Sequence, residues 1–113
     1  LKQKFVIAKG GEYIQGRVQL HKDLDKEAVS GGHWFFDIEG RTLYLYGKSE
    51  DFGQFTKKQI EDDMEMVTHR LKRKGGDVKV IIDDETEYTL LELLTKHVGK
   101  DRAEELINGN DFI

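Results

Sequence analysis

Two short segments rich in aromatic and β-branched residues constrain the fold most. They are HWFFDI (33–38) and RTLYLY (41–46), and this composition is typical of strands. Glu39-Gly40 lies between them, and we expect Gly40 to supply the positive φ of a tight turn. Period-two alternation places apolar side chains on both faces of the first segment: Phe35 on one, and Trp34, Phe36 and Ile38 on the other. The pattern predicts a central hairpin, covered on at least one side.

Further strands are expected on either side of this hairpin in the sequence. Lys4–Ala8 and Tyr13–Leu20 flank a Gly10-Gly11 turn, and Gly16 indicates a bulge or a close approach. Residues 77–82 (DVKVII) form one more apolar, β-branched run. We therefore predict a mixed, mostly antiparallel sheet.

Helices are expected after the hairpin. Thr56 and Gln59 fit a capping box. An apolar stripe at helical spacing follows it: Ile60, Met64, Val67 and Leu71. This stripe predicts one long helix that ends at Gly75-Gly76. Two short C-terminal helices follow, the first capped by Thr89 and Glu92 and the second beginning at Asp101. The order of elements predicts an α+β fold.

Composition narrows the class of protein. A chain of 113 residues suits a single small domain. Cysteine is absent, which excludes disulfides, thiolate metal sites and cysteine nucleophiles. The net charge of −4 argues against nucleic-acid binding, and the basic run at 69–74 suits the C-terminal end of a helix. No apolar run approaches the ~20 residues that a membrane span needs. We expect a cytoplasmic protein without a membrane or nucleic-acid partner.

Two of the four histidines lie where a site could form. His21 follows a strand, and His33 follows two glycines at the start of the next. A metal site could combine them with Asp23, Asp25 or Asp37, but the spacing matches no zinc motif. We therefore expect no metal and no cofactor.

The loop GKSEDFG (47–53) follows the second strand of the hairpin and has two interpretations. Its N–H groups could form a nest for an anion, with a helix N-terminus close behind and charge from Lys48 or Arg41. It could also be a glycine-bounded turn in which Ser49 satisfies backbone groups. Two acidic residues, Glu50 and Asp51, oppose the anion interpretation.

Four blocks of the chain resemble the Janus/Ocnus family, to which the small phosphohistidine phosphatases belong. They are KFVI (4–7), VQLHKD (18–23), SGGH (30–33) and YLYGKSEDFG (44–53), in the family's order. The likeness covers roughly the first three-quarters of the chain. Residues 1–84 therefore resemble the phosphatase core, and 85–113 are an added C-terminal helical segment. Three features depart from the family: a shorter segment after His21, His33 in place of an arginine, and the acidic pair in the loop.

The resemblance implies metal-independent hydrolysis of protein phosphohistidine. His21 would be the catalytic residue, as general base or nucleophile. The phosphoryl group would be bound by the N–H groups around Lys48, Ser49 and Asp51, with help from His33 if protonated. The partner would be a phosphoprotein substrate. Separately, the exposed edges of a small mixed sheet are compatible with a monomer or a weak dimer.

The alternative is a non-catalytic protein- or anion-binding, regulatory module on the same fold. The two hypotheses differ in whether His21 must be accessible from a cleft. Convergence of His21, His33 and the amides of Ser49 on one open cleft would favour the enzyme. A buried His21, or a cleft filled by Glu50 or by the C-terminal tail, would favour the module.

Overall fold

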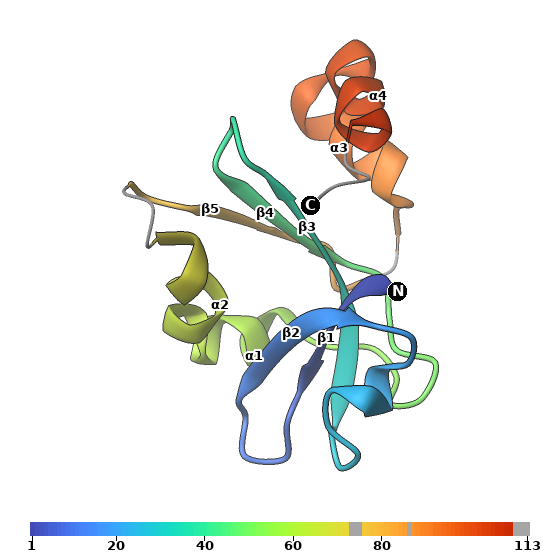
Figure 1. The fold of residues 1–113 in the computed structure, drawn as a ribbon, viewed down its shortest axis with the longest axis vertical. Coiled ribbons are helices and arrows are strands. Elements are labelled where there is room, and N and C mark those ends of the chain that lie inside the picture. Colours follow the sequence, from blue (N-terminus) through green and yellow to red (C-terminus); the bar gives the residue numbers. More distant parts are fainter. Residues whose placement is uncertain (73–75, 86, 110–113) are drawn as a thin grey trace.

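A computed structural model describes residues 1–72, 76–85 and 87–109. One five-stranded sheet runs in the order β2-β1-β3-β4-β5 (Figure 1). Its strands are β1 (Lys2–Ile7), β2 (Tyr13–Val18), β3 (Ser30–Asp37), β4 (Thr42–Tyr46) and β5 (Lys79–Ile82). All neighbouring strands are antiparallel except β4 and β5, which are parallel. The predicted single small α+β domain with a mixed, mostly antiparallel sheet is confirmed.

The aromatic hairpin β3–β4 lies at the centre of the sheet, as predicted, but its turn is built differently. Arg41, not Gly40, carries the positive φ, at 47°. Gly40 is required for another reason: a Cβ there would meet the Asp37 carboxylate, which accepts a hydrogen bond from the Gly40 N–H at 3.1 Å. The turn is therefore organised by the side chain of Asp37.

One face of the sheet packs against α1 (Lys57–Asp62) and α2 (Met64–Lys72). Trp34 and Phe36 lie in this layer, whereas Ile38 lies beyond the end of β3 and is 57% exposed. Ile38 therefore adds nothing to the buried core of this face. The buried core of this face consists of Phe5, Ile7, Tyr13, Trp34, Phe36, Leu43, Leu45, Phe55, Ile60 and Val67.

The opposite face is covered by α3 (Leu90–Val98) and α4 (Lys100–Asn108), which stand away from α1 and α2 in Figure 1. Phe35 and Tyr44 of the central hairpin pack here against Leu93, Leu94 and Ala103. The alternation that separated Phe35 from Trp34 is thus confirmed. Arg102 of α4 binds Asp37 at 3.3 Å and Glu39 at 2.7 Å, which ties the C-terminal helices to the hairpin.

The expected long helix is interrupted at Asp63. This residue has φ −128° and ψ 33°, outside the helical region. Its carboxylate accepts a hydrogen bond from the N–H of Tyr13 at 2.7 Å, so the interruption fixes the helices against β2. The apolar stripe nevertheless stays on one face, because Ile60, Met64, Val67 and Leu71 all join the same core.

The two predicted threonine capping boxes are confirmed. Thr56 caps α1 with Gln59, and Thr89 caps α3 with Glu92. The second C-terminal helix begins one residue earlier than predicted, at Lys100, with Gly99 before it at φ 87°. Part of the predicted Gly75-Gly76 helix end and of the basic run 69–74 lies outside the described residues. Within the described ranges, no helix is long and apolar enough to cross a membrane.

Candidate functional site

Three segments meet at the beginning of β3: the short 3-10 helix η1 (His21–Asp23), the first residues of β3, and the loop 47–53. Gly31 makes this meeting sterically feasible. A Cβ at Gly31 would lie 2.6 Å from the Phe5 carbonyl oxygen, 3.0 Å from Cδ2 of His21 and 3.2 Å from Cβ of Ser49. The N–H of Gly31 also donates to the carbonyl of Gly53 at 3.3 Å, which attaches the loop to the strand.

His21 is buried at this meeting point, with only 3% of its surface exposed. Its Nε2–H donates to the carbonyl oxygen of Gly32 at 2.7 Å. Burial lowers the pKa of His21, opposed by the Gly32 carbonyl and by the carboxylates of Asp51 and Glu50. The neutral ring therefore carries its proton on Nε2 and its lone pair on Nδ1. His21 is held by the fold rather than presented to solvent.

His33 lies beside His21, on the first half of β3. The two ring centroids are 5.3 Å apart with an interplanar angle of 77°. Burial lowers the pKa of His33 to about 4, with smaller contributions from His21 and Lys4. His33 is therefore neutral near pH 7 and does not supply the positive charge that a phosphate-binding role would require.

Four N–H groups of the loop, those of Ser49, Asp51, Phe52 and Gly53, donate to oxygen atoms of the loop itself. Oγ of Ser49, which is 1% exposed, accepts hydrogen bonds from the N–H of Asp51 at 3.2 Å and of Phe52 at 3.0 Å. The backbones of Ser49 and Gly53 bond to each other in both directions, at 3.2 and 2.8 Å. Positive φ values of 70° at Gly47 and 86° at Gly53 bound the turn. This is the glycine-bounded turn organised by a serine that the sequence left open as one interpretation.

The acidic residues of the loop take different positions. The Asp51 carboxylate faces η1 and accepts a hydrogen bond from the Lys22 N–H at 3.4 Å, while the side chain of Glu50 is exposed. Beside Asp51 lies an open hollow of ≈ 420 Å³, lined by Lys22, Asp23, Lys26, Asp51 and Phe52. Its two lysines face two aspartates, so its charges balance. Lys22 and Lys26 were not singled out from the sequence, although their i, i+4 spacing after a strand end is a usable signal.

The remaining predicted site residues are not brought together. Lys48 is exposed, and its side chain bonds to no other described residue. Arg41 lies at the opposite end of β4, where its guanidinium donates to the carbonyls of Leu71, Gly76 and Asp77. It therefore cannot supply charge to the loop. Across the described ranges, no group of three or more His, Asp or Glu residues is placed to hold a metal ion.

Comparisons with known proteins do not identify a function for this site. No family model, curated protein or solved structure matches the chain. What the chain does has to follow from the chemistry of its own residues.

Proposed function

We propose that this chain is a non-catalytic protein-binding module on a fold that resembles the Janus/Ocnus phosphatases. The observation that carries the proposal is the closed hydrogen-bond pattern of the loop. The N–H groups of Ser49, Asp51, Phe52 and Gly53 all bond within the loop. To reach them, a phosphoryl oxygen would have to displace Ser49 Oγ, the Ser49 carbonyl or the Gly53 carbonyl.

The position of the base supports the same conclusion. General-base attack on phosphorus requires the base to reach a water molecule next to the substrate. His21 is 3% exposed, and one ring nitrogen is bonded to Gly32. The Asp51 carboxylate on the Lys22 N–H places a negative charge where a phosphoryl group would approach. A phosphoryl group and the Asp51 carboxylate are both negative and would repel each other. The net charge of −4 on the chain adds to this repulsion.

The test is release of phosphate from a histidine-phosphorylated protein. We expect the wild-type chain and His21→Ala to give the same rate as buffer, with circular dichroism confirming that both are folded. Release by the wild type that disappears in His21→Ala would contradict the proposal. His69→Ala is the matched control, because His69 is an exposed histidine on α2, outside the site.

Phosphohistidine hydrolysis is the second candidate function. It is favoured by the approach of His21, His33 and Ser49 around Gly31. In this case Asp51 would have to leave Lys22 when the substrate binds. Asp51→Ala would then raise the rate of phosphate release. The non-catalytic proposal instead expects Asp51→Ala, like the wild type, to release no phosphate above the buffer rate.

We propose further that residues 1–84 are the phosphatase-like core and that 85–113 are an added helical segment. What supports this division is that all five strands and both α1 and α2 lie before residue 84, whereas α3 and α4 follow the last strand and pack over Phe35 and Tyr44. Both rings are almost fully buried, at 2% and 1% exposure, so removal of the segment would expose a large apolar surface. We expect a chain ending at residue 84 to aggregate or to bind a hydrophobic dye strongly.

A further inference from the structure

The outer edge of β2 has backbone groups without a strand partner. β2 is an edge strand and pairs only with β1. The Ile7 carbonyl bonds to the N–H of Val29, on the β3 side, so Ile7, Phe5 and Gln3 direct their backbone groups away from β2. Their opposite residues on β2 are Tyr13, Gln15 and Arg17, whose N–H and C=O groups therefore point outward.

Among the residues that the structure describes, one closes an end of this edge. The N–H of Tyr13 donates to the Asp63 carboxylate at 2.7 Å. For the outward N–H and C=O of Gln15 and Arg17, no hydrogen bond to a described residue is formed. Such groups are a template for another extended chain.

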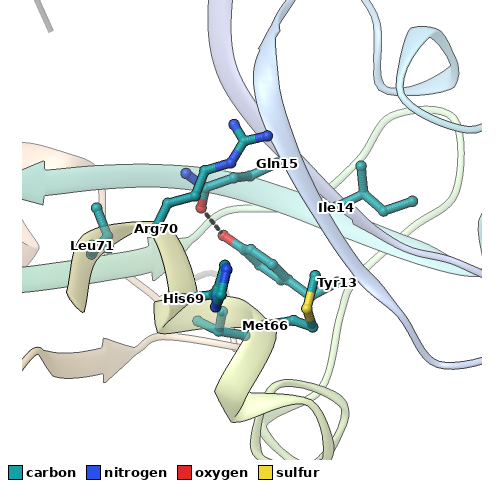
Figure 2. Close-up of a pocket in the computed structure, with 8 residues that line it drawn as sticks. Tyr13, Ile14, Gln15, Met66, His69, Arg70 and Leu71 are labelled. Carbon is teal, nitrogen blue, oxygen red and sulfur yellow. Dashed lines mark hydrogen bonds between the residues drawn. The ribbon is translucent and has the colours of Figure 1, made fainter. Parts of the chain in front are cut away.

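A groove adjoins this edge on the α2 side. It holds ≈ 180 Å³ and is lined by residues of β2 and α2. Figure 2 shows the Tyr13 ring, bonded to Gln15, facing His69 and Arg70, while Ile14 points away from them. Met66 forms one end and is 54% exposed, which gives the groove a flexible apolar wall. The volume suits one or two side chains of a bound segment.

The charge around the groove is opposite to that of the whole chain. Arg70 lines it and His69 stands beside Arg70, while none of its lining residues is acidic. Arg17 extends the basic surface along β2, where it lies over the Trp34 ring at 5.9 Å. The carboxylate of Asp63, between α1 and α2, is bonded to the backbone N–H of Tyr13. In a chain of net charge −4, this local basic surface favours an acidic partner.

We infer that the β2 edge and its groove bind an extended, acidic segment of a partner protein, which adds a strand beside β2. The segment pairs its backbone with Gln15 and Arg17, places carboxylates against Arg17 and Arg70, and inserts an apolar side chain next to Met66. The inference rests on the proposed function, because it names the surface and the partner class of the binding module.

A second copy of the chain is the competing occupant, and charge disfavours it. Two β2 strands paired about a two-fold axis would bring Arg17 and Arg70 of both copies to one interface. Like charges at an interface are costly unless acids separate them. The occupant is therefore a different, acidic chain.

The experiment uses the whole chain and a synthetic octapeptide in which glutamate alternates with valine. We expect the peptide to shift the backbone amide NMR signals of Gln15 and Arg17 and to slow their hydrogen exchange. Arg70→Glu should bind it about tenfold more weakly. Lys100→Glu is the matched control, since it reverses an exposed charge on α4, and it should bind as the wild type does.

Two control peptides separate strand pairing from charge alone. A peptide with proline in place of every valine keeps the charge but cannot pair as a strand, and it should not shift Gln15 or Arg17. A peptide with lysine in place of glutamate should not bind.

Several results would overturn the inference: no shift at Gln15 and Arg17, equal binding by Arg70→Glu, equal binding of the proline peptide, or a β2-mediated dimer in sedimentation. None of these would restore catalysis, so the proposed function could still stand. Conversely, phosphate release that depends on His21 would overturn the proposed function and leave the NMR result unaffected.

Discussion

The rings of His21 and His33 lie 5.3 Å apart and nearly perpendicular, and both are kept neutral by burial. A second positive charge at this distance would be repelled by the first, and Lys4 adds to the effect at both rings. The pair therefore links the stability of this end of the sheet to pH.

Acidification should destabilise the fold through this pair. The pKa of His33 is about 4 in the folded chain, whereas the ordinary pKa of a histidine, 6.5, applies to the unfolded chain. Between these values the unfolded chain binds more protons, so the free energy of unfolding decreases as pH falls from 6.5 toward 4. The full shift would correspond to about 3 kcal/mol, and solvent screening of the partly exposed ring keeps the contribution of His33 below this value. His21 acts in the same direction. Urea unfolding at a series of pH values measures this.

His33→Gln should flatten that pH dependence, because the titrating ring is removed. His69→Gln, on the exposed surface of α2, should leave the slope unchanged. A wild-type free energy of unfolding that stays constant from pH 7 to pH 4.5 would contradict the assignment of His21 and His33 as a neutral pair.

Removal of the hydroxyl at Ser49 should loosen the loop. Ser49→Ala leaves the N–H groups of Asp51 and Phe52 without their acceptor, in a partly buried position. We expect a loss of about 1–3 kcal/mol in the free energy of unfolding. The exposed neighbour Glu50→Ala should change it by less than about 0.5 kcal/mol. Equal effects of the two substitutions would mean that the serine does not organise the turn.

Two glycines of the loop separate backbone strain from steric conflict. Gly47 and Gly53 both have positive φ, at 70° and 86°. A Cβ at Gly47 would lie 2.7 Å from Nδ1 of His33, whereas a Cβ at Gly53 meets nothing within 4 Å. Gly53→Ala should therefore cost about 1–2 kcal/mol from strain alone. Gly47→Ala should cost more and should also perturb the NMR signals of the His33 ring.

Equal stability of Gly47→Ala and Gly53→Ala would mean that the His33 ring can move away from a Cβ at Gly47 at little cost. Thermal unfolding and urea unfolding of both variants, side by side with the wild type, decide between these outcomes.

The sequence predicts those parts of the fold whose causes are local. A capping box needs only residues three positions apart, so Thr56 with Gln59 and Thr89 with Glu92 were recognisable. The two-residue period of a strand is enough to place Phe35 on one face of the sheet and Trp34 and Phe36 on the other.

The features that the sequence did not predict depend on contacts between distant residues. The positive φ at Arg41 goes with a guanidinium that reaches the carbonyl of Leu71, 30 residues away. The break at Asp63 depends on the Tyr13 amide, 50 residues away. At the candidate site, the glycine and serine pattern fitted both an open nest and a closed turn. The direction of the Ser49 side chain and the backbone bonds between Ser49 and Gly53 distinguish them, and no local spacing determines either.

The bond between Asp63 and Tyr13 gives the last prediction. The Asp63 carboxylate accepts a hydrogen bond from the outward N–H of Tyr13 on β2, at 2.7 Å. Asp63 is also the residue that separates α1 from α2. Asp63→Ala should lower the free energy of unfolding by about 1.5–3 kcal/mol, because a bond to a charged group is lost. Asp62→Ala is the matched control. Its carboxylate pairs with Lys58 on the surface, where both side chains are more than half exposed, at 61% and 81%, and such pairs contribute about 0–1 kcal/mol.

Hydrogen exchange at the Tyr13 amide gives a second measurement for the same pair of variants. Exchange should become faster in Asp63→Ala and stay as in the wild type in Asp62→Ala. Because the freed N–H lengthens the open edge of β2 by one donor, Asp63→Ala should also bind the acidic octapeptide at least as well as the wild type. A slower exchange at Tyr13 in Asp63→Ala would show that another group closes this end of the strand.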